Sequence, residues 1–81
     1  MRVQVKLFAA AREIAGADIV DVELPSEASF ADLRTKLLSA YPQLAPVGRS
    51  SIFAADARYV SDEESIAETA EIALIPPVSG G

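Results

Sequence analysis

The last six residues are the part of this chain best suited to chemistry. They read Pro76-Pro77-Val78-Ser79-Gly80-Gly81, so two prolines begin a stem that ends in two glycines and a carboxylate. Proline fixes φ and has no backbone N–H, so a strand that ends at Ile75 should leave its sheet there and continue in an extended form over roughly 20 Å. Because glycine has no Cβ, a partner could close on the bare backbone of the terminal pair and expose the carboxylate to a reaction.

The remaining composition offers little for catalysis by side chains. The 81 residues include no cysteine and no histidine, which excludes disulfides, thiolate nucleophiles, thiolate metal ligands and the usual acid–base group near neutral pH. A chain of this size buries only about 60% of its unfolded surface, which leaves little room for an internal active site. We therefore expect a protein without a bound cofactor or metal, which is not an autonomous enzyme and acts through its terminus and its surface.

The charge balance narrows the class of partner. The formal net charge is −5, which disfavours nucleic acid and anionic membranes but suits basic protein surfaces. The acidic stretch 62–71 could steer such an association, although a charge run is more often solvated surface. No apolar run approaches the roughly 20 residues of a membrane span, and residues 1–6 lack a signal-peptide pattern, so we expect a cytoplasmic protein.

The first half of the chain predicts two strands and two helices. Apolar and polar residues alternate over residues 2–7 and 19–24, which predicts two strands that pair as antiparallel neighbours. Between them, residues 9–15 favour a short helix that ends at Gly16 in the left-handed conformation. Ser29-Phe30-Ala31-Asp32 has the pattern of a capping box, and the main helix that follows must end before a proline. We expect four of its residues to face inward and three to lie elsewhere on its circumference: Phe30, Leu33, Leu37 and Ala40, and then Arg34, Thr35 and Ser39.

The second half predicts the rest of a sheet. Residues 43–51 read as a connection, and two short strands at 52–55 and 58–60 flank Asp56-Ala57. Ser61 to Glu64 again resembles a capping box and predicts a brief helical turn before a final strand at 71–75.

This order of elements predicts an α+β fold. We expect a β-grasp, ubiquitin-like roll, in which one main helix covers a mixed sheet of about five strands. The first and last strands should lie centrally and parallel to each other. The domain would then span residues 1–75, with an extended functional tail at 76–81.

Three segments together resemble a known family. Leu7-Phe8-Ala9-Ala10-Ala11-Arg12-Glu13-Ile14-Ala15-Gly16, the segment 54–60 and the tail from Ile75 are similar to molybdopterin synthase small subunits, which are ubiquitin-like sulfur carriers. The resemblance covers essentially the whole chain. It departs at two turns, since the family usually has Asn near Ala55 or Asp56 and Gly-Asp-Glu where this chain has Thr69-Ala70-Glu71.

The resemblance implies a chemistry for the tail. A free terminal carboxylate is ionised at neutral pH and is a poor electrophile, so it must first be activated. In similar proteins, a ubiquitin-activating-like adenylyltransferase uses ATP and Mg²⁺ to form an acyl-adenylate, and a sulfur donor enzyme converts it to a thiocarboxylate. The tail then enters the large synthase subunit and passes sulfur to cyclic pyranopterin monophosphate, which forms the molybdopterin dithiolene. Two carriers would flank a large-subunit dimer in a heterotetramer.

Residue roles follow from the same resemblance. Gly81 would be the covalent carrier, Gly80 would provide steric clearance, and the guided stem would be Pro76, Pro77, Val78 and Ser79. Phe8, Tyr59 and Ile75 lie where the family has an apolar docking surface, although each could equally belong to the core. Arg12 could meet an acidic site of the activating enzyme or remain a solvated surface group.

Other functions stay open at this point. The chain could be a protein modifier joined through Gly81 to a lysine of another protein, a sulfur carrier for thiazole synthesis, or an interaction module with an inert end. A frayed terminus or a cloning scar would also explain two final glycines. The long match over residues 7–16 disfavours the thiazole carrier. The intact mass of the chain separates these functions. Sulfur loading exchanges one oxygen atom for sulfur, whereas a modifier forms conjugates with other proteins that contain Gly81, and an inert module shows neither.

Overall fold

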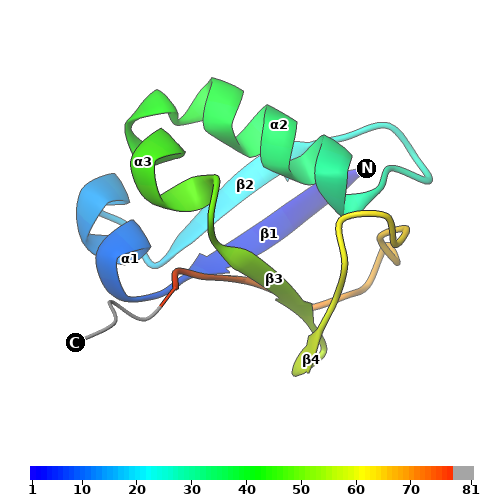
Figure 1. Ribbon diagram of the computed structural model, residues 1–81. Coiled ribbons are helices and arrows are strands. Elements are labelled where there is room, and N and C mark those ends of the chain that lie inside the picture. The colour runs from blue at the N-terminus through cyan, green and yellow to red at the C-terminus, as the bar shows by residue number, and fades with distance from the viewer. Residues whose placement is uncertain (78–81) are drawn as a thin grey trace.

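A mixed sheet with helices on one side organises the chain (Figure 1). The computed structural model describes residues 1–77, and the part of the tail from 78 to 81 lies outside the described residues. The strand order across the sheet is β2-β1-β5-β3-β4. The elements in chain order are β1 (Arg2–Leu7), α1 (Ala9–Ala15), β2 (Ile19–Glu23), α2 (Phe30–Ala40), η1 (Pro42–Leu44, a 3₁₀ turn), α3 (Ala45–Gly48), β3 (Ile52–Ala55), β4 (Arg58–Tyr59) and β5 (Ile72–Ile75).

The last strand lies inside the sheet. β5 pairs in parallel with β1, where Val5 is opposite Ile72, and antiparallel with β3, where Ile52 is opposite Ile75. β1 also pairs antiparallel with β2, and β3 with β4. The predicted mixed sheet, with neighbouring parallel first and last strands and one main helix across it, is confirmed.

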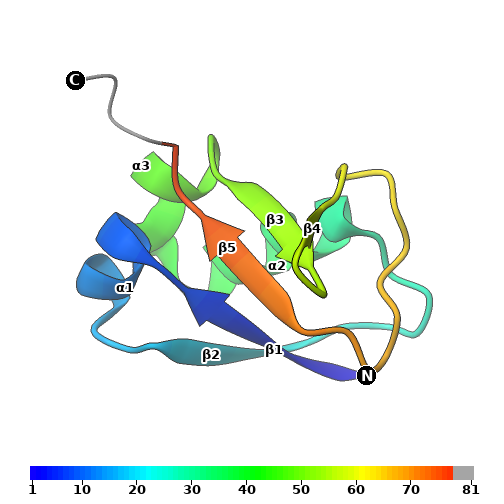
Figure 2. The same cartoon turned by 90° about the horizontal axis from the view of Figure 1, so that it is seen from below.

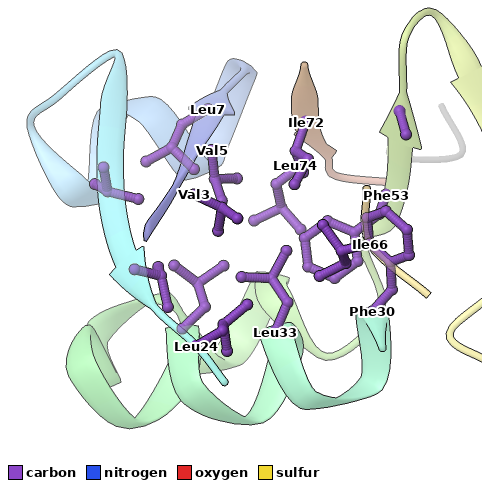
Figure 3. Close-up of a cluster of buried hydrophobic side chains, with 14 of the residues drawn as sticks. Val3, Val5, Leu7, Leu24, Phe30, Leu33, Phe53, Ile66, Ile72 and Leu74 are labelled. Atoms are coloured by element: carbon purple, nitrogen blue, oxygen red, sulfur yellow. The ribbon is translucent and has the colours of Figure 1, made fainter. Parts of the chain in front are cut away.

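The core lies between this sheet and α2 (Figure 3). Along β1 the buried and exposed residues alternate strictly, as the sequence pattern predicted. α2 contributes Phe30, Leu33 and Leu37, and Phe30 packs on Phe53 with ring centroids 5.6 Å apart. Ala40, expected in the core, is exposed instead because the helix ends there. The other face of the sheet carries no helix in the described residues (Figure 2).

Local signals at the helix ends are confirmed. The Ser29 backbone N–H donates to Asp32 Oδ2 at 2.9 Å, and the Asp32 N–H donates to Ser29 Oγ at 3.2 Å, which completes the capping box. Gly16 ends α1 with φ +70°, the left-handed region in which a residue with Cβ is strained.

One prediction in the connecting segments was wrong, and one was close to the structure. Residues 42–48 form η1 and α3 rather than an irregular connection, because each of the two prolines there stands in the first turn of its helix, where it lacks no needed hydrogen bond. Residues 61–64 form a single turn, in which the Glu64 N–H donates to the Ser61 carbonyl at 3.2 Å, close to the brief helical turn predicted there. Their carbonyl groups at Asp62 and Glu64 accept hydrogen bonds from the first backbone N–H groups of α2, so this loop caps another helix.

Arg34 makes contacts that the sequence pattern did not predict. Its Nε and Nη2 donate to the two carboxylate oxygens of Asp62 at 2.9 and 2.8 Å, and its guanidinium lies 4.9 Å from the centroid of the Phe53 ring. The hydrogen bond from Arg34 is the main cause that lowers the pKa of Asp62. This pair joins α2 to the loop that caps it.

Candidate functional site

The base of the tail is the end of β5. Pairing with β1 and β3 holds this strand on both sides, and the pairing with β3 ends at Ile75. Pro76 is half-buried and Pro77 is exposed, and neither belongs to a strand. The chain therefore leaves the sheet where the two prolines predicted it would. Val78, Ser79, Gly80 and Gly81 lie outside the described residues, so their roles stay predictions.

An apolar patch lies on the open sheet face beside this base. Phe53 and Leu74 are fully buried toward α2, so their strand neighbours face the other way. Ile52 is opposite Ile75, Ala54 is opposite Ala73, and Tyr59 is opposite Ala54. Ile52 and Tyr59 are 50% and 69% exposed. We call these five residues the open-face patch: Ile52, Ala54, Tyr59, Ala73 and Ile75. Ile52 and Tyr59 supply its exposed surface, Ala73 and Ile75 are half-buried, and Ala54 is buried.

Phe8 lies at the same end of the sheet. It follows Leu7, which is buried and opposite Leu74, so Phe8 comes level with Ile75 and alternates toward the open side. It is 42% exposed, and its extended backbone serves as the N-cap of α1. Of the predicted docking residues, Phe8 and Tyr59 are thus exposed, and Ile75 is half-buried within the patch.

Two residues illustrate the limits of the sequence reading. Ile52 was not predicted as a docking residue, although its alternation with Phe53 in a short strand already pointed to the opposite face. Arg12 lies on α1, where its Nε is 3.8 Å from Asp18 Oδ1, so its charge is partly balanced within the chain. The structure therefore gives Arg12 an intramolecular partner and leaves its predicted contact with an activating enzyme a prediction.

The described residues offer no separate centre for metal chemistry. No group of three or more His, Cys, Asp or Glu in residues 1–77 could hold a metal ion. A helix long and apolar enough to cross a membrane is also absent from this part of the chain. What the site presents is a strand-anchored stem beside an apolar face, an arrangement suited to delivering a terminus into another protein.

Comparisons with known proteins agree with this arrangement. The sequence matches the ThiS family over residues 5–81. It is 37% identical over 83 residues to the molybdopterin synthase sulfur carrier subunit of Chlamydomonas reinhardtii, with 100% of both chains covered. The structure aligns with SAMP1 from Haloferax volcanii with a TM-score of 0.85 and 31% identity, over 100% of both chains.

A more distant structure shares the fold alone. It belongs to the complex of subunits 1 and 2 of molybdopterin-converting factor from Helicobacter pylori, with a TM-score of 0.70, 20% identity and 100% of both chains covered. The family match spans nearly the whole chain, and the Chlamydomonas relative extends over its full length. The resemblance to ubiquitin-like sulfur carriers is therefore confirmed, and this chain belongs to the ThiS family.

Proposed function

We propose that this chain is the sulfur carrier subunit of molybdopterin synthase, with Gly81 as the residue that carries the sulfur. The observation that supports this most directly is β5, an inner strand that continues at Ile75 into the stem Pro76-Pro77. The Chlamydomonas sulfur carrier subunit, matched over the whole of both chains, supports the assignment of this stem to sulfur transfer.

The proposed cycle uses the terminal carboxylate and no side chain of the carrier. The Gly81 carboxylate oxygen attacks the α-phosphorus of ATP, and pyrophosphate leaves. A donor enzyme that holds its sulfur as a cysteine persulfide then attacks the acyl carbon with the terminal sulfur, and AMP leaves. A thiol reduces the resulting acyl disulfide, which releases the thiocarboxylate and leaves a disulfide between that thiol and the donor cysteine. Each loaded tail carries one sulfur atom, whereas a dithiolene contains two, so each molybdopterin formed consumes two loaded tails. The adenylyltransferase, and not this chain, would bind ATP and Mg²⁺. Because the activation step consumes ATP, we place the cycle in the cytoplasm.

We assign the open-face patch and Phe8 to partner docking. Clustered, exposed apolar residues commonly mark protein interfaces, and this cluster adjoins the strand that anchors the stem. A partner that covers the patch would receive the tail in a fixed direction, because Pro76 and Pro77 restrict the backbone at its base. The partners implied are the large synthase subunit and the ubiquitin-activating-like adenylyltransferase.

Intact mass spectrometry tests the carrier function. The full chain is incubated with the adenylyltransferase, ATP, Mg²⁺ and a sulfur donor, and its mass should rise by the difference between sulfur and oxygen. A variant that lacks Gly81 should fold, because the core lies within residues 3–74, but should not be charged. Ala57→Gly, which leaves the tail intact, is the matched control and should be charged. Charging of the truncated variant would refute the assignment to Gly81.

A second function has one specific observation in its favour. The similar structure from Haloferax volcanii is SAMP1, and a related structure from that organism is described as small archaeal modifier protein 1. A modifier would use the same adenylated Gly81 but pass its acyl carbon to a lysine amine, with AMP as the leaving group. Conjugates that contain the Gly81 acyl group, in place of a thiocarboxylate, would favour the modifier.

A further inference from the structure

The segment that joins α3 to β3 lies beside the base of the tail (Figures 1 and 2). It leads into Ile52, and Ile52 pairs with Ile75, the last residue before the stem. Arg49 and Ser50 are the exposed residues of this segment, and both neighbours, Gly48 and Ser51, are buried. Any partner that receives the stem therefore approaches Arg49 as well.

Partly buried hydrogen bonds hold the backbone on both sides of Arg49. Arg34 Nη1 donates to the carbonyl oxygens of Gly48 and Ser51, at 2.6 and 2.9 Å. The Ser51 hydroxyl, 4% exposed as a residue, donates to the Val47 carbonyl at 2.7 Å. The Arg49 N–H itself donates to a carbonyl within α3. The backbone that presents the Arg49 side chain is therefore already ordered before a partner binds.

The guanidinium of Arg49 differs from the other arginines of the chain. Each of those lies within 4.0 Å of a carboxylate: Arg2 near Glu23, Arg12 near Asp18, Arg34 near Asp62 and Arg58 near Glu64. Within residues 1–77, Arg49 is the only arginine side chain without such a pair, in a chain whose formal net charge is −5. A pre-positioned cation without an internal partner suits an anion on another molecule.

That anion must belong to the partner protein and not to the reacting substrate. Six residues in extended form span roughly 20 Å, so a partner that receives the tail in this form would hold Gly81 far from Arg49. The partner residues that come close to Arg49 are those that surround the base of the stem, at the rim of the site that receives the tail. A carboxylate side chain there matches the guanidinium in charge and in bidentate geometry.

We propose that Arg49 pairs with a carboxylate of the molybdopterin synthase large subunit at the rim of the site that receives the tail. The proposal rests on the function proposed above. Arg49 would be a positioning residue, since the proposed contact is with the partner protein and not with the reacting groups. Together with the open-face patch it would give the partner two contacts of different chemistry beside the β5 end, which fixes the direction of the stem.

Binding of the purified large subunit to the full chain tests the proposal. We expect Arg49→Glu to weaken the dissociation constant by roughly tenfold or more, and Arg49→Gln to weaken it less. Arg49→Gln should also flatten the salt dependence of binding, a readout that a merely structural residue would not change. Arg58→Glu is the matched control. Arg58 is an exposed cation beyond the other end of β3, so this variant should bind within about twofold of the wild type.

The outcomes separate the two proposals. If the wild type binds and Arg49→Glu binds within about twofold of it, the role of Arg49 is refuted while the carrier function stands. If the wild type itself does not bind the large subunit, the proposed function fails, and this inference fails with it. Because the Arg49 side chain is exposed, both Arg49 variants should keep the thermal midpoint of the wild type, and this is measured in parallel for every variant.

Discussion

Replacement of Arg34 by alanine should destabilise the protein strongly. The side chain is only 18% exposed, and it supplies two hydrogen bonds to Asp62, two to backbone carbonyl groups and a stacking contact with Phe53. Removal of one partner from a buried ion pair costs about 3–5 kcal/mol. Asp62 is 35% exposed, so water can rehydrate its carboxylate in part, and we expect a loss of about 2–4 kcal/mol.

This loss is large relative to the whole stability of such a domain. At roughly 0.05–0.15 kcal/mol per residue, an 81-residue chain has a free energy of unfolding of about 4–12 kcal/mol. Urea unfolding followed by circular dichroism should therefore show a clearly lower midpoint with an unchanged slope. The urea midpoint of Arg34→Lys should lie between those of the wild type and Arg34→Ala. Lysine keeps the positive charge, but its ammonium group cannot reproduce the planar, bidentate geometry of the guanidinium.

Two further variants make the test specific. Thr35→Ala, at the exposed neighbouring position of α2, should change the stability by less than about 0.5 kcal/mol. A double-mutant cycle of Arg34→Ala with Asp62→Asn should give a coupling free energy of about 1–3 kcal/mol. A loss below about 1 kcal/mol in Arg34→Ala would show that solvent replaces these contacts, and it would refute the claim that Arg34 holds the loop beside the stem.

Three other predictions concern pH, a turn and the patch. The pKa of Asp62 lies below its ordinary value of 3.8, so the Arg34 pairing stabilises the fold above that value and the stabilisation is lost as pH falls through the lowered pKa. The stability difference between wild type and Asp62→Asn, measured by urea unfolding, should therefore be constant above about pH 5 and shrink below about pH 4. Ala57→Gly should raise the stability by about 0.5–1 kcal/mol, because Ala57 has φ +65° in the turn between β3 and β4; an unchanged or lower urea midpoint would contradict this. Ile52→Glu should leave the fold intact but weaken binding to the large subunit by roughly tenfold or more, whereas the equally apolar and exposed Ile14 on α1 should tolerate Glu; equal binding by both variants would exclude the patch as a docking surface.

Local patterns predicted most of the fold. β1 and β2 were found because one face of each is buried, so their sequences carry a period of two. The start of α2 was found because Ser29 and Asp32 cap it within four residues. Such signals depend on residues close together in the chain, and these are the interactions that a single sequence displays.

Long-range pairings could not be predicted in the same way. Arg34 and Asp62 are 28 residues apart, and nothing in the pattern of α2 distinguishes Arg34 from its exposed neighbours. The capping pattern at 61–64 predicted a brief helical turn, but it did not reveal that Arg34 binds the Asp62 carboxylate. The backbone of this turn also caps α2. Arg49 likewise became notable only when the structure showed which arginines have partners.

β5 explains how one short strand can serve both stability and recognition. Ile72 and Leu74 point into the core, whereas Ala73 and Ile75 belong to the open face, because successive side chains alternate across a sheet. Hydrogen bonds to β1 and β3 fix the strand on both sides, so its end holds the stem more firmly than an edge strand would. Changes at the inward residues should therefore alter unfolding, and changes at the outward residues should alter binding. The fold can thus remain constant while the surface beside the tail adapts to its partners.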